Sequence, residues 1–162
     1  MYQVLIVDDE PIVKIALRSM IDWESLGFHI CATASNGEEA LEMAERFHPD
    51  LMICDLKMPV MDGIDLIKAA KDKKMDCEFL VISNYEDFNY VRTALVLGAS
   101  DYILKVSISP EELTSQLQKV KTKLEDKQAK KEPEDSVETS LLHQERHAAW
   151  REFFTHKSYP LE

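Results

Sequence analysis

The stretch LMICDLKMPVMDG, residues 51–63, decides the fold of this chain because it joins an apolar run to a carboxylate and a loop. Residues 51–54 have the length and composition of a buried strand, and Asp55 follows them directly. Pro59 and Gly63 then mark the segment after Asp55 as a loop. A carboxylate at the end of a buried strand lies at the carboxyl edge of a sheet, where open α/β sheets bind their ligands. We therefore expect Asp55 to lie in a binding site.

Three other apolar runs also end in polar side chains. They are residues 4–7, 79–82 and 102–104, which are followed by Asp8 and Asp9, by Ser83 and by Lys105 respectively. If the strands are parallel, these ends meet at the edge that carries Asp55. The combination of carboxylates, a hydroxyl and an ammonium group suits one task, which is to hold a divalent cation and a phosphoryl group on an aspartate.

Strands and helices alternate along the chain. Five strands are expected at residues 3–7, 28–34, 51–54, 78–82 and 102–104. Helices are expected at residues 11–26, 36–47, 63–73, 88–97 and from Pro110 to about residue 124. This order predicts an α/β fold in which a parallel five-stranded sheet is covered by helices on both faces.

The composition changes near residue 125. Residues 1–125 have the length and apolar content of one domain, whereas residues 125–135 are almost wholly polar and include Pro133. Residues 136–154 can form a further helix. The apolar side chains at its end, which need cover from solvent, are Trp150, Phe153 and Phe154. We expect residues 126–162 to be a helical linker that leads to an output domain absent from this chain.

The bulk composition excludes several classes of protein. A net charge of −11 and a pI near 4.9 argue against binding of nucleic acid or an anionic membrane by this segment. No basic leader precedes the first strand and no apolar run approaches the length of a membrane span, so we expect a cytoplasmic protein. The isolated Cys31, Cys54 and Cys77 have no disulfide or metal-site spacing, and we expect them to be reduced.

The acidic residues are suited to Mg²⁺, which prefers oxygen ligands and keeps several bound waters. We expect Asp9 and Asp55 to bind the ion directly and Asp8 to bind it through water. The backbone carbonyl of Lys57 can complete the set. Clustered carboxylates repel one another, and a bound cation relieves that repulsion.

The phosphoryl group would be carried by Asp55 as an aspartyl phosphate. In that state Lys105 supplies a second cation, and the Ser83 hydroxyl can donate to a phosphoryl oxygen. Taken singly, these residues have simpler explanations: an acidic strand end is often a helix N-cap, a lysine after a strand is usually solvated, and a serine usually belongs to a turn. Their joint occurrence at four strand ends favours the functional interpretation.

The motifs that carry this chemistry are VDDE at residues 7–10, DLKMPVMDG at residues 55–63, Ser83, and GASDYILK at residues 98–105. In this order they resemble the receiver domain of two-component response regulators. The resemblance covers about residues 2–125 and implies a CheY-like, flavodoxin-like (βα)5 fold with strand order 2-1-3-4-5. It also implies Mg²⁺-dependent phosphotransfer from a sensor histidine kinase to Asp55, with Ser83 and Lys105 sensing the phosphate. By the same resemblance, Tyr102 is an aromatic switch that turns inward when Ser83 moves toward the phosphoryl group.

Two further segments suggest a subfamily. IDWESLGF at residues 21–28 and SNYEDFNYV at residues 83–91 resemble receivers joined to an AraC-type DNA-binding domain. This implies that the chain is the N-terminal part of a transcription factor, which contacts DNA only through a C-terminal domain.

We also expect a homodimer, because the last helix carries an a/d seam. The seam consists of Leu113, Leu117, Val120 and Leu124, at spacings of 4, 3 and 4. The first two should pack on the sheet, whereas Val120 and Leu124 should be more available to a partner or linker helix.

Two other functions and one point of geometry stay open. The first alternative is a pseudo-receiver that serves for dimerisation without phosphorylation. The second is a phosphatase of the haloacid-dehalogenase kind, which needs a second acid at the position of Lys57. Because Val106 replaces the proline that usually follows the lysine in the family, the Lys105–Val106 peptide bond is either trans with a shifted lysine or cis under strain.

Overall fold

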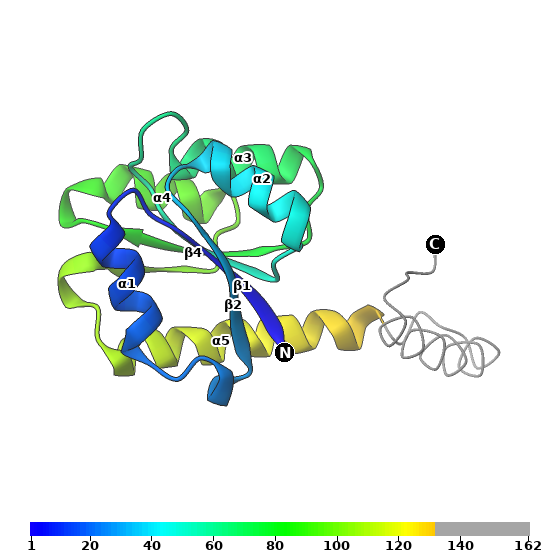
Figure 1. Cartoon of the computed structure of the whole chain (residues 1–162). Helices are drawn as coiled ribbons and strands as arrows, with labels where there is room; N and C mark the ends of the chain where they lie inside the picture. The colour runs from blue at the N-terminus through cyan, green and yellow to red at the C-terminus, as the bar shows by residue number, and fades with distance from the viewer. Residues whose placement is uncertain (132–162) are drawn as a thin grey trace, which may run out of the picture. The chain divides into compact units, whose positions relative to one another are not determined.

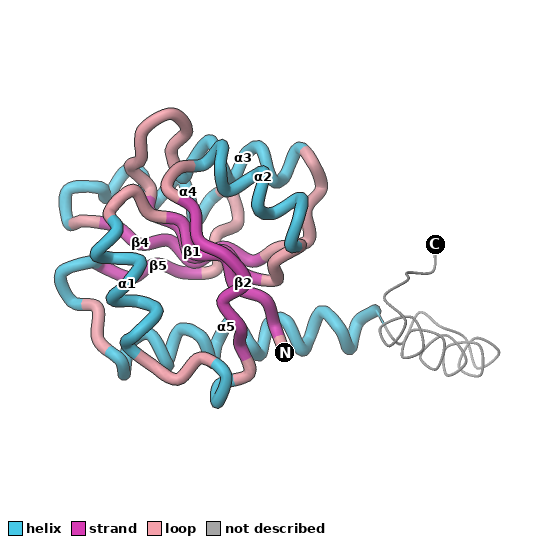
Figure 2. The backbone as a smooth tube through the Cα atoms, viewed as in Figure 1, coloured by secondary structure: helices cyan, strands magenta, loops and turns pink. Residues whose placement is uncertain are grey.

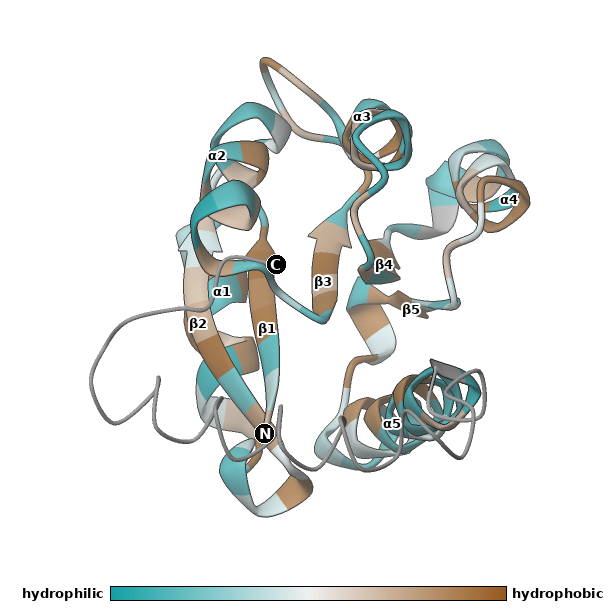
Figure 3. Ribbon diagram, turned by 90° about the vertical axis from the view of Figure 1, so that its right-hand side faces the viewer, coloured by the Kyte–Doolittle hydropathy of each residue, from teal (hydrophilic) through white to brown (hydrophobic). Residues whose placement is uncertain are grey.

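Five parallel strands form one sheet in the order β2-β1-β3-β4-β5, as labelled in Figure 3 and drawn from another side in Figures 1 and 2. Their bounds are β1 (Tyr2–Val7), β2 (Phe28–Ala34), β3 (Leu51–Asp55), β4 (Glu78–Ser83) and β5 (Asp101–Leu104). Every neighbouring pair in the sheet is parallel. The α/β fold and the strand order 2-1-3-4-5 expected from the sequence are therefore confirmed.

The computed structural model describes residues 1–131 of the chain. Residues 1–121 form one compact unit, and residues 122–131 are the described part of a second unit. The helix predicted over residues 136–154, with Trp150, Phe153 and Phe154, lies outside the described residues. None of the helices within residues 1–131 is both long enough and apolar enough to cross a membrane.

Helices cover both faces of the sheet. The α-helices of the described residues are α1 (Pro11–Met20), α2 (Gly37–Phe47), α3 (Gly63–Asp72), α4 (Phe88–Val96) and α5 (Pro110–Lys131). Short 3-10 turns lie at η1 (Glu24–Leu26), η2 (Tyr85–Asp87) and η3 (Lys105–Ser107). Figures 1 and 3 show α2, α3 and α4 on one face and α1 with the first turns of α5 on the other.

The first helix is shorter than predicted. It ends at Met20 rather than near residue 26, because the backbone at Ile21 is extended. Trp23 then folds back into the core, where its indole N–H donates a 3.0 Å hydrogen bond to the carbonyl of Leu17. Gly27, with φ of 89°, closes the following turn by donating its N–H to the carbonyl of Glu24. A buried tryptophan and a left-handed glycine therefore end the helical periodicity early.

The last helix is longer than predicted. It continues to Lys131, through polar residues whose side chains, Lys, Gln and Glu among them, are good helix formers. Leu113, Leu117 and Val120 are all buried within the first unit. The expectation that Val120 is available to a partner helix is therefore wrong, because the helix buries this residue against its own domain. Leu124 belongs to the second unit.

The core is built from the two faces of the central strands. Every residue of β3 and of β4 is buried, as strands covered on both faces should be. On one face, Leu5 and Val7 of β1 belong to the same apolar cluster as Met52, Cys54 and residues of α2, α3 and α4. The burial of both faces fixes the register of the strands, and with it the positions of their carboxyl ends.

Gly63 allows α3 to begin directly against the end of β3. Its N–H donates a 2.9 Å hydrogen bond to the carbonyl of Leu56. A Cβ atom at this position would lie 2.4 Å from the carbonyl oxygen of Asp55 and 2.9 Å from the Cα of Leu56. The glycine is therefore required by the close approach of two backbone segments.

Candidate functional site

Four carboxylates meet at the carboxyl edge of the sheet. Asp8, Asp9, Glu10 and Asp55 each offer an oxygen atom, and these atoms all lie within 4.8 Å of one another. Asp8 and Asp55 are buried, at 0% and 3% exposure, whereas Asp9 and Glu10 face solvent. The site is thus a buried acidic pair with an exposed acidic rim.

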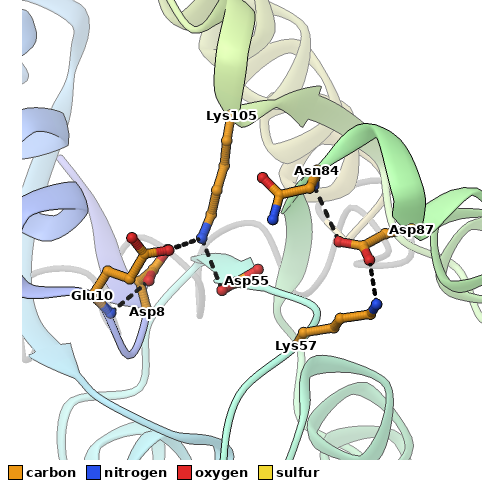
Figure 4. A network of polar contacts seen from close by, with 7 residues as sticks. All are labelled: Asp8, Glu10, Asp55, Lys57, Asn84, Asp87 and Lys105. Carbon is orange, nitrogen blue, oxygen red and sulfur yellow. Dashed lines mark hydrogen bonds and ion pairs between the residues drawn. The ribbon is translucent and has the colours of Figure 1, made fainter.

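Lys105 reaches into this cluster from the end of β5 (Figure 4). Its Nζ lies 3.0 Å from Asp55 Oδ2, 3.3 Å from Asp8 Oδ2 and 2.9 Å from Glu10 Oε1. All peptide bonds among the described residues are trans, the bond to Val106 included. Of the two geometries left open by the sequence, the structure therefore has the trans bond, and the lysine still reaches Asp55.

Burial and charge act in opposite directions on these groups. Burial and, to a smaller extent, the neighbouring Asp8 raise the pKa of Asp55, a hydrogen bond from Lys105 lowers it, and the net result is a pKa of about 6. Burial likewise raises the pKa of Asp8. For Lys105, burial lowers the pKa, but the hydrogen bonds with Glu10 and Asp55 outweigh it and leave the pKa above its usual value. Lys105 is therefore held in the charged form by the carboxylates that surround it.

The carboxylates fit a small divalent cation. Asp8 Oδ1 accepts the N–H of Glu10 at 2.8 Å, whereas the buried Oδ2 has no hydrogen bond within the described part of the chain. A buried carboxylate oxygen without a hydrogen bond is costly, and Lys105, the cation that lies against it in the described part of the chain, is shared with two other acids. The residues that could hold a hard cation are Asp8, Asp9, Glu10 and Asp55.

Ser83 and Tyr102 both line a cavity at the carboxyl ends of β4 and β5. Ser83 is fully buried at the end of β4, and within the described residues its Oγ has no hydrogen-bond partner. Tyr102 of β5 is 40% exposed. Both residues line a cavity of about 400 Å³, whose other walls include Phe88, Val91 and Leu104.

A second polar network lies next to the cluster and involves Lys57, two residues after Asp55 (Figure 4). The Lys57 Nζ lies 2.8 Å from Asp87 Oδ1 and stands over the ring of Tyr90, 5.2 Å from its centroid. Asp87 Oδ2 in turn accepts the backbone N–H of Asn84 at 3.1 Å. The side chain of Lys57 is thus directed to the start of α4 and away from Asp55.

Comparison with known proteins assigns the chain to a family. Residues 4–118 match the response regulator receiver domain. The chain belongs to the response regulator receiver family. It is 33% identical over 143 residues to the transcriptional regulatory protein YesN of Bacillus subtilis, which covers 88% of this chain and 39% of that protein. The chain therefore spans about two fifths of the length of this curated relative.

Solved receiver structures agree in fold. The receiver domain of AraT, a response regulator from Geobacillus stearothermophilus, is 42% identical, with a TM-score of 0.74 over 78% of this chain and 98% of that one. A two-component transcriptional regulator AraC from Clostridium phytofermentans is 32% identical, with a TM-score of 0.69 over 77% and 97% of the two chains. The chain is thus the receiver domain of a two-component response regulator whose relatives include transcriptional regulators.

The receiver brings together the side chains that the sequence singled out at the strand ends. Asp8, Asp55 and Lys105 are in direct contact, and Asp9 lies in the same acidic group. Ser83 and Tyr102 line one cavity at the carboxyl ends of β4 and β5.

Two contributors were not assigned a role from the sequence. Glu10 directly follows Asp9, so its position at the end of the first strand could have indicated that it belongs to the acidic group. Asp87 stands within the SNYEDFNYV segment, but nothing in the sequence indicates that it pairs with Lys57.

Proposed function

We propose that the receiver accepts a phosphoryl group on Asp55 from a sensor histidine kinase, in a reaction that requires Mg²⁺. The observation that supports this best is the setting of Asp55. Its buried carboxylate lies 3.0 Å from the Lys105 ammonium and belongs to the acidic group that could hold a cation. A phosphoryl group on Asp55 would meet positive charge from Lys105 and, once a cation is bound, from that ion as well.

The proposed roles follow from positions in the site. Asp9 and Asp55 would bind the ion directly, Asp8 would bind it through water, and the backbone carbonyl of Lys57 would complete the protein ligands. When bound, Mg²⁺ supplies charge that offsets the phosphoryl oxygens. An Asp55 oxygen attacks the phosphorus, the bond from phosphorus to the donor's leaving group breaks, and the donor departs with the bonding electrons. Lys105 then pairs with a phosphoryl oxygen.

Ser83 and Tyr102 are the proposed switch. Among the described residues the buried Ser83 hydroxyl has no hydrogen-bond partner, so it could donate to a phosphoryl oxygen. Movement of Ser83 toward Asp55 would enlarge the cavity between the two residues, and the half-exposed ring of Tyr102 would then turn into it. The phosphorylation state would thus be reported on the surface of α4 and β5.

We further propose that this switch controls a DNA-binding output domain in a cytoplasmic transcription factor that acts as a homodimer. Support comes from the AraC-type and YesN relatives, which are described as transcriptional regulators. With a net charge of −11 over its 162 residues, this chain is itself unsuited to binding DNA. The receiver would act as a phosphoacceptor with Mg²⁺-dependent self-phosphorylation and self-dephosphorylation only, and not as an enzyme.

Labelling with acetyl phosphate tests the proposal. The wild-type chain should take up about one phosphoryl group in the presence of Mg²⁺ and release it slowly. Asp55→Asn and chelation of the metal should each abolish uptake. Lack of uptake by the wild type would favour a pseudo-receiver, rapid multiple turnover would favour a phosphatase, and persistent labelling of Asp55→Asn would show that another residue is the acceptor.

A further inference from the structure

We propose that the ion pair between Lys57 and Asp87 is a latch that holds the connection between β4 and α4 in its unphosphorylated arrangement, so that Lys57 sets how readily the receiver responds to a phosphoryl group. The proposal rests on the function proposed above. It makes Lys57 a positioning residue, which acts through Asp87 and Ser83 and not through contact with the phosphoryl group.

The latch joins the two loops that flank the acidic cluster. Lys57 belongs to the loop after Asp55, and Asp87 closes the turn after Ser83. Their charged atoms are 2.8 Å apart, and the ring of Tyr90 packs beneath the ammonium group. Figure 4 shows Lys105 directed to Asp55 and Lys57 directed away from it. The two lysines beside Asp55 therefore serve different partners.

Asp87 depends on Lys57 because it is a buried charge. It is 1% exposed, and its other oxygen accepts the N–H of Asn84 in the capping box that forms η2. A buried carboxylate is tolerated when it is paired and hydrogen-bonded, and loss of one partner leaves an uncompensated charge. Loss of Lys57 would therefore destabilise this arrangement of the turn between Ser83 and α4.

The turn that Asp87 closes is also the segment that must move in the switch. Asn84 directly follows Ser83, whose hydroxyl lacks a hydrogen-bond partner within the described residues. If Ser83 moves toward a phosphoryl group on Asp55, the backbone of Asn84 moves with it. The hydrogen bond from the Asn84 N–H to the Asp87 carboxylate would then be stretched.

This movement decides whether loss of the ion pair strengthens or weakens phosphoryl binding. The ion pair stabilises the unphosphorylated arrangement. Because a phosphoryl group must break this pair to bind in the switched arrangement, the pair lowers its apparent affinity. Loss of the pair should therefore increase the apparent affinity for a phosphoryl mimic. If Lys57 instead bound the phosphoryl group directly, its removal would decrease that affinity.

The experiment measures binding of beryllofluoride, a phosphoryl mimic, at saturating Mg²⁺ by following the amide resonances of residues 84–87. Lys57→Met and Asp87→Asn should each bind the mimic more tightly than the wild type, by on the order of five-fold or more. Because both variants break the same pair, the double variant should bind no more tightly than either single one. Lys57→Arg, which keeps the cation, should return the affinity toward that of the wild type.

Lys73→Met is the matched control. It also removes a lysine from an ion pair, with Glu45, but both partners are exposed and lie at the C-terminal ends of α3 and α2. It should leave mimic binding unchanged. Urea unfolding of every variant identifies any that fail to fold. If either Lys57→Met or Asp87→Asn fails to fold, the other variant is used for the test.

Each result separates the latch from the proposed function. If the wild type fails to bind beryllofluoride with Mg²⁺, the proposed function is wrong and the latch falls with it. If the wild type binds the mimic but Lys57→Met and Asp87→Asn bind it equally well or less well, the latch is wrong and the phosphoacceptor function stands. Additive effects in the double variant would also contradict the latch.

Discussion

At the scale of single residues, the ionised Asp55 should destabilise the metal-free receiver at neutral pH. Burial raises its pKa from 3.8 to about 6, so the native state binds a proton more tightly than the unfolded state. The contribution of the Asp55 carboxyl group to the free energy of unfolding is therefore greatest below about pH 4, where the group is protonated, and is lost as the pH rises through about 6. Asp55→Asn should raise the free energy of unfolding at about pH 7.5 by roughly 1–3 kcal/mol.

Urea unfolding in the presence of a chelator measures this difference. The advantage of Asp55→Asn should shrink as the pH falls through 6 toward about 4, because the wild-type carboxylate then becomes neutral. Added Mg²⁺ should stabilise the wild type more than the variant, since the ion binds only the carboxylate form. An advantage that stays the same at both pH values would contradict the assignment of the raised pKa to Asp55.

The two aspartates after β1 should differ in their effect on Mg²⁺ binding. Asp9 is exposed and free to bind the ion directly, whereas Asp8 is buried with one oxygen already committed to the N–H of Glu10. Asp9→Ala should therefore weaken Mg²⁺ binding more than Asp8→Ala in a calorimetric titration. Glu42→Ala, which removes an exposed acid from α2, controls for the change in net charge. Equal losses for the two aspartates would contradict the ordering.

At the scale of secondary structure elements, the start of α3 is the most sensitive junction near the site. Gly63→Ala would place a Cβ atom 2.4 Å from the Asp55 carbonyl oxygen, so β3 and α3 would have to separate. We expect a loss of roughly 1–3 kcal/mol in the free energy of unfolding, together with slower acetyl phosphate labelling. Lys68→Ala, an exposed change on the same helix, should alter neither quantity by much. Wild-type stability of Gly63→Ala would show that the junction can relax.

The coupling between β4 and β5 gives a second test at this scale. Beryllofluoride should change the environment of the Tyr102 ring in the wild type, and this change should be lost or much reduced in Ser83→Ala, which cannot donate to the mimic. Spectra of the labelled Tyr102 ring report the change directly. A ring signal that stays the same in the wild type, although the mimic binds, would contradict the proposed switch.

Sequence reasoning located the elements well because buried parallel strands are continuous apolar runs. The strands and the residues at their ends could be read from that pattern. The end of α1 could not, because it depends on the burial of Trp23 in three dimensions. The Lys57–Asp87 pair was also beyond the sequence, since it joins two loops that only the fold brings together. Position along a strand was predictable, whereas contacts between loops were not.

At the scale of the whole molecule, association should use α4 and β5 and not the apolar side of α5 within the first unit. Leu113, Leu117 and Val120 are buried inside the domain, whereas Phe88 and Val96 of α4 are 72% and 80% exposed. We expect beryllofluoride to shift the chain from monomer toward dimer in sedimentation experiments. Val96→Glu should weaken that shift, and Lys73→Met should not.

The same measurement can contradict the dimer model. A chain that stays monomeric with and without the mimic, at concentrations where the full-length regulator dimerises, would place the interface outside the receiver. A shift that is unchanged by Val96→Glu would place it on another face of the receiver.

The cavity between Ser83 and Tyr102 also has a pharmacological consequence. Its volume of about 400 Å³ is that of a small organic compound, and its walls combine apolar side chains with the hydroxyl of Ser83 and the guanidinium of Arg92. A compound that occupied it would keep the Tyr102 ring outside without touching the acidic cluster. Such an inhibitor would leave phosphorylation of Asp55 intact but block the movement of Tyr102 that follows it. The regulator would then be phosphorylated but inactive.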